Sequence, residues 1–389
     1  MEQQLYELPE GWCLATLPKV VDENGLFTDG DWVESKDQDP SGDVRLIQLA
    51  DIGVGEYRDR SSRFLTYDKA KELNCSFLRT NDILFARMPD PIGRACLFPG
   101  DEKQSVTVVD VAIIRPASKL VNANWLVYQI NSPQFHASVV ALQKGATRKR
   151  ISRKNLATIQ FPLPPLNEQK RIVAKLDALF TRIDAAITHL QETLELSKAL
   201  FASALDEVFT KAANEFEVKP ISKIFTITSG DGLTQKNMVK DGPYDVYGGN
   251  GISGRHNEYN RSGLNVVIGR VGAWCGNVRL VDGDIWVTDN AFFVKSYLAE
   301  VFEPYLVAAL QHLNLRDTAN QAAQPVISYK GIKELPIPLP SMKEQGRIVT
   351  HLDDLAEHTR TLEVETQERL DQLSTLKSSL LDSAFRGKL

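Results

Sequence analysis

The sequence has little cysteine and no long apolar run. Its 389 residues include four cysteines, at positions 13, 75, 96 and 275, and none of them forms a Cys-x-x-Cys pair. This spacing argues against a disulfide framework and against a zinc site, so we expect four small buried thiols. No apolar stretch approaches the about 18 residues of a membrane helix, and no cationic segment followed by an apolar one opens the chain. We therefore expect a cytoplasmic protein without a membrane span or a signal peptide.

The sequence also lacks the motifs of common catalytic and nucleotide-driven proteins. An amino-methyltransferase needs a short Asp/Asn-Pro-Pro-Tyr/Phe motif, which Asp90-Pro91-Ile92 does not match. The glycines of residues 247–251 lack the strand-loop-helix frame of a cofactor loop, and no Walker lysine follows a glycine-rich loop. The six histidines are dispersed, without HExxH spacing. We therefore expect a binding protein that is not an enzyme and holds no metal or cofactor.

The dominant feature that is present is a segment that occurs twice. Residues 161–177 read FPLPPLNEQKRIVAKLD and residues 337–353 read IPLPSMKEQGRIVTHLD, an offset of 176 positions. The same offset pairs Ile151 with Ile327 and Phe209 with Phe385 without a gap. Two copies at so long a period indicate tandem duplication of a large structural unit. We therefore predict two similar halves related by an approximate twofold axis.

A long apolar stripe with helical spacing follows each copy. Apolar residues recur three or four positions apart from Ile172 to Val208 and again from Ile348 to Leu380. Neither stretch contains Pro or Gly beyond its first turn, so each predicts a helix on the order of 60 Å long at ~1.5 Å per residue. Because such a long helix needs a partner, we predict that the two pair as an antiparallel coiled coil within the chain.

The remaining segments have the pattern of mixed α/β units with short strands and long loops. Strands are expected at 44–49, 82–86, 95–98, 106–115, 264–269, 277–281, 285–287 and 291–296. Helices are expected at 67–73, at 125–142 with an interruption near Pro133, and at 304–315. Loops 29–43 and 229–260 are longer than usual connections and are candidate binding loops. The predicted class is α+β, with globular domains at residues 1–160 and 211–335 and spacer helices at 161–210 and 336–389.

Charge is unevenly distributed along the chain. The net charge of −5 does not favour nucleic-acid binding, but residues 144–167 are cationic without an acidic residue, and an acidic helix follows them. A local cationic run can bind phosphates even when the total is negative. A solvated loop is the alternative interpretation.

Several segments together resemble the specificity subunits of type I restriction-modification systems. They are the two copies of the repeated segment together with Leu8–Trp12, Tyr247–Tyr259 and Leu381–Leu389, and the resemblance covers essentially the whole chain. It implies two target-recognition domains separated by two antiparallel helices, without catalysis. It further implies that the chain binds a split sequence in double-stranded DNA and directs adenine methylation and restriction by partner subunits, in defence against foreign DNA.

The resemblance also implies the partners and their cofactors. Two modification (methyltransferase) subunits would dock on the helices, and restriction/translocase subunits would complete the assembly. S-adenosylmethionine, ATP and Mg²⁺ would be bound by those subunits and not by this chain. A two-headed adaptor that binds proteins, with a coiled-coil spacer, is the alternative function.

The side chains that read DNA are Arg or Lys for guanine and Asn or Gln for adenine. Arg87 and Arg270 each end an expected strand and have a glycine six residues later, so they occupy matching positions; a structural ion pair would explain this pattern equally well. We predict an asymmetric target, with one half read by residues before about 160 and the other by residues 219–329, near one turn of DNA apart (~10.5 base pairs). The candidate DNA-binding residues are Arg87, Arg94, Lys144, Arg148, Lys149 and Arg150 in the first domain and Lys236, Asn250, Arg255, His256, Arg270, Gln321 and Gln324 in the second.

Overall fold

The chain folds into two compact units that each combine sheets with helices. The computed structural model describes residues 8–21, 23–145, 149–320 and 324–389. Unit 1 comprises the chain up to Leu190 together with Glu368–Leu389, and unit 2 comprises Gln191–Gln367. The mixture of helix and sheet in both units confirms the predicted α+β class.

Unit 1 contains three small sheets. The largest is antiparallel and has the strand order β2 (Leu26–Asp29), β8 (Val111–Arg115), β5 (Ile83–Ala86), β6 (Ala95–Leu97). A second sheet has the order β4 (Phe64–Leu65), β3 (Val44–Ile47), β7 (Gln104–Thr107), with β3 and β7 parallel. The third pairs β1 (Cys13–Thr16) with β9 (Gln160–Leu163). The short helices are α1 (Tyr67–Glu72), α2 (Ala123–Ile130), α3 (Pro133–Leu142) and α4 (Arg153–Leu156).

Unit 2 repeats this topology almost element by element. Its antiparallel sheet has the order β11 (Phe225–Ser229), β17 (Ala291–Tyr297), β14 (Asn265–Gly269), β15 (Val278–Val281). Its mixed sheet has the order β13 (Gly251–His256), β12 (Tyr244–Gly248), β16 (Ile285–Val287), with β12 and β16 parallel. The third sheet pairs β10 (Val218–Pro220) with β18 (Pro336–Pro338), and the short helices are α6 (Glu303–His312) and α7 (Tyr329–Ile332). The duplication therefore extends through the diverged domains, whereas the twofold axis relating them stays a prediction.

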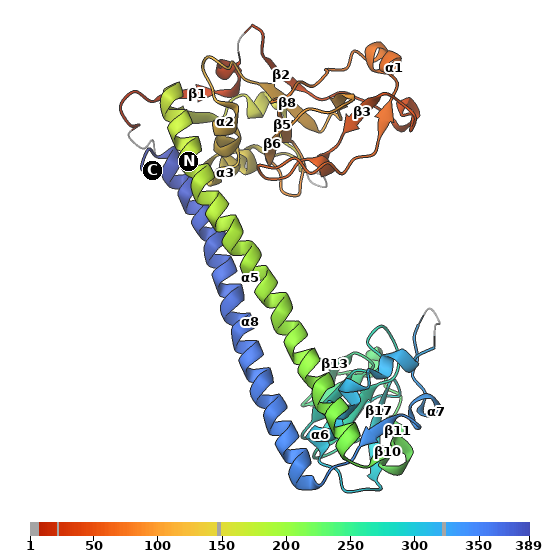
Figure 1. Ribbon diagram of the computed structural model, residues 1–389. Coiled ribbons are helices and arrows are strands. Elements are labelled where there is room, and N and C mark those ends of the chain that lie inside the picture. Colours follow the sequence, from red (N-terminus) through yellow and green to blue (C-terminus); the bar gives the residue numbers. More distant parts are fainter. Residues whose placement is uncertain (1–7, 22, 146–148, 321–323) are drawn as a thin grey trace. The chain divides into compact units, whose positions relative to one another are not determined.

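Two long helices, α5 (Leu166–Glu215) and α8 (Met342–Phe385), contribute to both units (Figure 1). Within unit 1, Asp184 of α5 pairs with Lys377 of α8, while the Arg171 side chain near the start of α5 donates to the Leu389 carbonyl beyond the end of α8. Position along α8 therefore increases as position along α5 decreases, so the helices are antiparallel in this unit. Within unit 2, the Ser197 hydroxyl donates to the Thr359 carbonyl at 3.4 Å.

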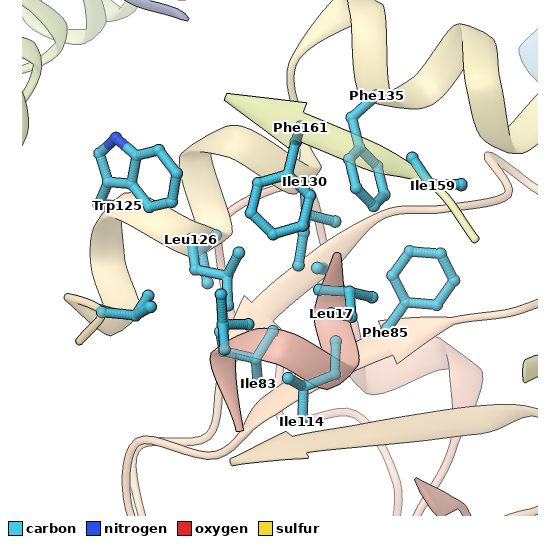
Figure 2. Packing of buried hydrophobic residues seen from close by; sticks show 14 of the residues in the cluster. Leu17, Ile83, Phe85, Ile114, Trp125, Leu126, Ile130, Phe135, Ile159 and Phe161 are labelled. Atoms are coloured by element: carbon cyan, nitrogen blue, oxygen red, sulfur yellow. The ribbon is translucent and has the colours of Figure 1, made fainter. Parts of the chain in front are cut away.

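The core of each unit includes the end of one long helix. In unit 1, strand, helix and loop residues converge on Trp125, Phe135 and Phe161 (Figure 2), and Phe385 from the end of α8 lies edge-on to Trp125, with ring centroids 5.9 Å apart. In unit 2, Phe209 from the end of α5 packs on Tyr305 at 5.4 Å. Phe209 and Phe385 are equivalent in the repeat, so an equivalent aromatic contact between a long helix and a short helix forms part of both cores.

A glutamine in each copy of the repeated segment bonds the start of a long helix to the backbone of one unit. Gln169 does so for α5 in unit 1, and Gln345 for α8 in unit 2. Gln169 is fully buried; its amide oxygen accepts the Asn122 N–H at 2.8 Å, and its amide nitrogen donates to the carbonyls of Leu120 and Pro164 at 3.1 and 2.9 Å. Gln345 is equally buried and makes the corresponding three bonds in unit 2, to Phe302, Glu300 and Pro340. Because the amide supplies both a donor and an acceptor, no apolar residue can replace it there without leaving backbone groups unpaired.

Replacement of Gln169 by Leu tests this role. We expect Gln169→Leu to lower the free energy of unfolding by about 3 kcal/mol, because one N–H and two carbonyls would be left buried without partners. The matched control is Gln191→Leu, at an exposed position of the same helix, which should change stability little. Urea denaturation followed by circular dichroism measures both, and equal effects of the two variants would contradict this role.

Several details differ from the sequence-based expectations. The expected strand 106–115 is two strands, β7 and β8, because residues 108–110 form a turn. The expected loop 229–260 contains the hairpin β12–β13, which its glycine-rich sequence concealed. The strands that were not expected are β1, β2, β4, β9, β10, β11 and β18. The interruption near Pro133 that the sequence predicts in the helix 125–142 is confirmed, because Ser132 caps a new helix that begins at Pro133. Three cysteines are buried, whereas Cys13 is exposed.

Candidate nucleic-acid interface

Arg87, at the end of β5, is held inside unit 1. Its side chain is 5% exposed, its Nε–H donates to the Ile151 carbonyl at 3.0 Å and its Nη1–H donates to the Val109 carbonyl at 3.1 Å. Asp29 forms an ion pair with the same guanidinium. Burial lowers the pKa of Arg87, and Asp29 opposes that shift. The side chain is therefore committed to the fold.

Arg270 makes the matching contacts in unit 2. Its Nη1–H donates to the Asp289 carbonyl at 3.2 Å, and its own carbonyl accepts the Ile327 N–H at 2.9 Å, as the Arg87 carbonyl accepts the Ile151 N–H at 3.1 Å. Each arginine thus holds the turn that precedes the long strand β8 or β17. A structural role therefore accounts for their shared position in the sequence, and Arg87 also has the ion pair that the alternative interpretation expected.

Arg94 is also a structural residue. It is 7% exposed, and its guanidinium donates to the carbonyls of Ile52, Leu49 and Pro91 at 2.6, 2.8 and 2.7 Å. We therefore assign Arg87 and Arg94 to the fold and leave them out of the DNA-contact set proposed below. Arg270 is only half-buried and stays a predicted DNA contact.

Two loops, 144–150 and 320–326, occupy equivalent places in the two units. Lys144 and Arg150 close the first loop by two backbone hydrogen bonds of 2.9 and 2.8 Å. Asn320 and Val326 close the second, since the Asn320 N–H donates to the Val326 carbonyl at 3.2 Å and its side chain accepts the Val326 N–H at 2.9 Å. The loops lie 176 positions apart, yet the described residues are cationic in one and amide-rich in the other. Arg148 and Gln321 lie outside the described residues.

The described cations of the first loop differ in exposure. Lys144 and Lys149 are exposed. Arg150 is half-buried: it donates to the Val109 carbonyl at 3.2 Å and pairs with Asp110 at 3.5 Å. The two lysines are therefore positioned to reach a phosphate, while Arg150 fixes the loop to the turn at 108–110.

A second pair of loops begins the two segments that were predicted as candidate binding loops, but the sequence reasoning missed that these loops are equivalent. Residues 28–31 (Thr-Asp-Gly-Asp) and 228–231 (Thr-Ser-Gly-Asp) lie 200 positions apart, an offset that also relates the lysines at 36 and 236 and the glycines at 42 and 242. A side chain on Gly30 would lie 2.2 Å from the Val108 carbonyl oxygen, and one on Gly230 would lie 1.9 Å from that of Val287. Both loops are thus pinned closely to the neighbouring strand. The repeated offset was the sequence signal that could have revealed them.

In unit 1 this loop borders a hollow beside the turn at 108–110. The Trp32 side chain at its rim is 68% exposed, and the indole N–H donates to Glu34 at 3.2 Å. Gln38 accepts a hydrogen bond from Arg63 at 3.3 Å. Burial raises the pKa of the Asp31 carboxyl, which accepts the Ser76 N–H at 2.9 Å. The hollow is lined by Asp31, Trp32, Val33, Glu34, Ser35, Gln38, Gln48, Leu49, Ala50, Arg63, Val108, Val109 and Asp110.

In unit 2, Asn250 and Gln324 lie in adjoining segments. Asn250 is exposed in the two-residue turn between β12 and β13, and Gln324 is exposed in the loop 320–326. A side chain on Gly249 would lie 2.0 Å from the Val271 carbonyl oxygen, and Val271 forms a bridge with Val326. The turn therefore packs against the strand that closes the loop, which places both amides on neighbouring parts of unit 2.

The other three candidates in unit 2 have different surroundings. Lys236 is exposed in the loop equivalent to that of Trp32. Arg255 is exposed, pairs with Asp245 at 3.2 Å and donates to the Pro243 carbonyl at 3.1 Å. His256 is half-buried, with its ring edge-on to Trp286 at 5.0 Å. Lys236 and Arg255 are thus accessible, whereas His256 supports the strand.

The part of the chain that the structure describes offers neither a metal site nor a membrane-spanning helix. Within it, no group of three His, Cys, Asp or Glu side chains could hold a metal ion. No helix among these residues is long and apolar enough to cross a membrane.

Two units of one topology, with differing loops in matching places, define the class of a two-headed recognition protein. The family model for the type I restriction modification DNA specificity domain matches residues 28–196 and 213–372. The chain belongs to this family.

Curated relatives agree with the family match. The specificity subunit of the type I restriction enzyme EcoBI from Escherichia coli is 25% identical over 309 residues, which cover 66% of this chain and 64% of that protein. The EcoKI specificity subunit of Escherichia coli strain K12 is 25% identical over 330 residues, covering 71% and 68%. The chain thus spans about two-thirds of the length of these relatives.

Solved structures share the fold. A chain from a study of complex assembly in the type I R-M system has a TM-score of 0.81 at 21% identity, covering 99% of this chain and all of that one. The HsdS subunit from Thermoanaerobacter tengcongensis has a TM-score of 0.63 at 21% identity, with full coverage of both chains.

Proposed function

We propose that this chain is the non-catalytic DNA-recognition subunit of a type I restriction-modification complex and that units 1 and 2 each read one part of a bipartite, asymmetric target. The observation that carries the proposal is the pair of loops 144–150 and 320–326, whose end residues are hydrogen-bonded at equivalent places in the two units while their described residues differ in charge. Cationic side chains suit phosphates, and amides suit adenine edges. Two surfaces of different chemistry, carried by two units of the same topology, suit a DNA target whose two half-sites differ in sequence.

The test is the sequence that the assembled complex methylates. The chain, produced together with its modification subunits, should direct adenine methylation to a split, asymmetric site, which sequencing of methylated genomic DNA would reveal. Methylation at one continuous site, or at sites unaffected by exchange of this chain, would contradict the proposal. The spacing of about one helical turn (~10.5 base pairs) between the half-sites stays a prediction.

The cationic loop is proposed to bind the DNA backbone. Because phosphate contacts contribute affinity without sequence information, Lys144→Ala with Lys149→Ala should weaken binding by the complex while the methylated sequence stays the same. The slope of log affinity against log salt should fall by about 0.9 for each lost contact. Fluorescence anisotropy across a salt series measures it, with Lys119→Ala, an exposed lysine outside the loop, as control. A changed methylation sequence would show that the loop reads bases.

Two modification subunits are proposed to dock on the long helices. Leu200 in unit 2 and Leu376 in unit 1 are equivalent in the repeat and are 52% and 44% exposed. Exposed leucines at matching places on two helices suit two copies of one partner, since burying each would stabilise a complex. S-adenosylmethionine, ATP and Mg²⁺ would belong to the modification and restriction/translocase subunits, and the cytoplasm, where DNA is accessible, would be the location.

Charged substitutions test this docking. Leu200→Glu or Leu376→Glu alone should leave complexes with one modification subunit, and the double variant should leave none, because a carboxylate in an apolar contact is costly. Native mass spectrometry counts the bound subunits. Gln191→Glu, which adds the same charge at another exposed position, is the control; retention of both subunits by the double variant would place docking elsewhere.

A further inference from the structure

The hollow described above is lined on one side by the solvent-exposed indole ring of Trp32. With 68% of its surface exposed, Trp32 leaves a large apolar ring in water, and such a ring gains free energy from any partner that covers it. Its indole N–H is bonded to Glu34 at 3.2 Å, which orients the ring. The matching position in unit 2 is Gly232, so unit 1 has an aromatic side chain at this position and unit 2 does not. Such a difference is expected of a residue that distinguishes two half-sites.

The polar groups of the hollow suit an adenine edge. An amide side chain offers a donor and an acceptor side by side, which match N7 and the N6 amine of adenine in the major groove. Gln38 lies in the lining, and Arg63 fixes its amide by donating to Oε1 at 3.3 Å. A carbonyl oxygen has a second lone pair, so this atom can still accept from the adenine amine.

The surrounding charges exclude the DNA backbone from the same place. Glu34, Asp31 and Asp110 line the hollow against one cation, Arg63, so the acidic groups outnumber it and would repel a phosphate. A further cation lies next to the hollow, because Arg150 binds the Val109 carbonyl and Asp110, two residues of the lining. A phosphate held by the loop 144–150 would therefore bring a neighbouring base edge toward Trp32.

We propose that this hollow reads one A·T base pair in the half-site of unit 1, with Gln38 bonded to adenine and Trp32 packed against the thymine methyl group. This inference rests on the proposed function and adds to it the chemistry of one position. Trp32 and Gln38 are thus specificity-determining residues.

The first experiment compares methylation specificity. The complex with its modification subunits would be given a library of duplexes randomised within the target, and methylated molecules would be sequenced. For Trp32→Ala and for Gln38→Leu, preference for A·T at one position of the unit 1 half-site should fall roughly 5- to 150-fold, while other positions keep theirs. Leu120→Ala, which truncates an exposed apolar side chain outside the hollow, should change nothing.

The second experiment identifies the contacted atoms. Uracil in place of thymine removes the methyl group and should weaken binding by the wild-type complex but not by the Trp32→Ala complex. Adenine with carbon in place of N7 should weaken binding by the wild type but not by Gln38→Leu. Trp32→Phe should retain part of the response to uracil, and thermal unfolding would confirm that each variant is folded.

The possible results distinguish a failure of this inference from a failure of the proposed function. If the wild-type complex shows no sequence preference, the proposed function fails. If the wild type has a bipartite target but its unit 1 half-site lacks an A·T pair, the reading of adenine is wrong. A target unchanged by both substitutions, or a uniform loss of affinity at all sequences, would likewise overturn the inference.

Discussion

Arg87→Met is expected to lower the free energy of unfolding of unit 1 by about 3 kcal/mol, because it removes a buried guanidinium and leaves the partly exposed Asp29 with a single, more distant cation. Arg87 also satisfies the carbonyls of Ile151 and Val109, which methionine cannot do. The effect should appear as a lower denaturant midpoint for the transition of unit 1, with the transition of unit 2 unchanged.

The structure supplies a matched control for this variant. Arg153 approaches the same Asp29, at 3.8 Å, but its side chain is 48% exposed. Arg153→Met should therefore cost at most about 1 kcal/mol, as expected for a solvated ion pair. If Arg87→Met left stability unchanged and altered the methylated sequence instead, Arg87 would be a base-reading residue.

Exchange of the globular part of unit 2 for that of a relative is expected to replace one half-site completely. The suggested junctions lie in β10 and β18, because Val218 pairs with Pro338 and Lys219 with Ile337, so a graft between them enters and leaves at adjacent points. The other half-site should persist, since unit 1 keeps all its loops. Methylation sequencing of the chimaera measures both halves together.

The reciprocal exchange is the control for this experiment. A graft between β1 and β9, which pair from Cys13 with Leu163 to Thr16 with Gln160, should change only the half-site that the first chimaera retained. A change of both half-sites by either graft would contradict the separate reading of the two halves.

The long helices could be predicted because their signal is redundant. The stripe, the repeated segment and the absence of Pro and Gly all indicate the same element, and long periodic segments are the most reliable sequence pattern. The repeat also showed which residues are equivalent. The repeat could not show that Gln169 and Gln345 are buried and bonded to several backbone groups, because glutamine is usually exposed. Their partners, such as Asn122 and Phe302, also lie far away in the sequence.

The candidate site was harder to predict because exposure is set by tertiary structure. Arg87 and Lys144 are both basic residues near glycines, yet one is buried and the other exposed. Trp32 was not a candidate, since a single tryptophan in a sequence is more often a core residue than a surface wall. The hairpin β12–β13 was hidden because its glycines give neither a strand pattern nor a helical one.

The aromatic contact that closes each core has a consequence for the order of events during synthesis. Phe209, which packs in unit 2, precedes the strands of that unit in the chain, whereas Phe385, which packs in unit 1, is translated long after the strands of unit 1. At about 5–20 residues per second, a ribosome needs roughly 10–45 s to travel from Phe161 to Phe385. Unit 1, most of which is synthesised first, therefore completes its core last. A nascent chain has both units fully folded only near the end of translation.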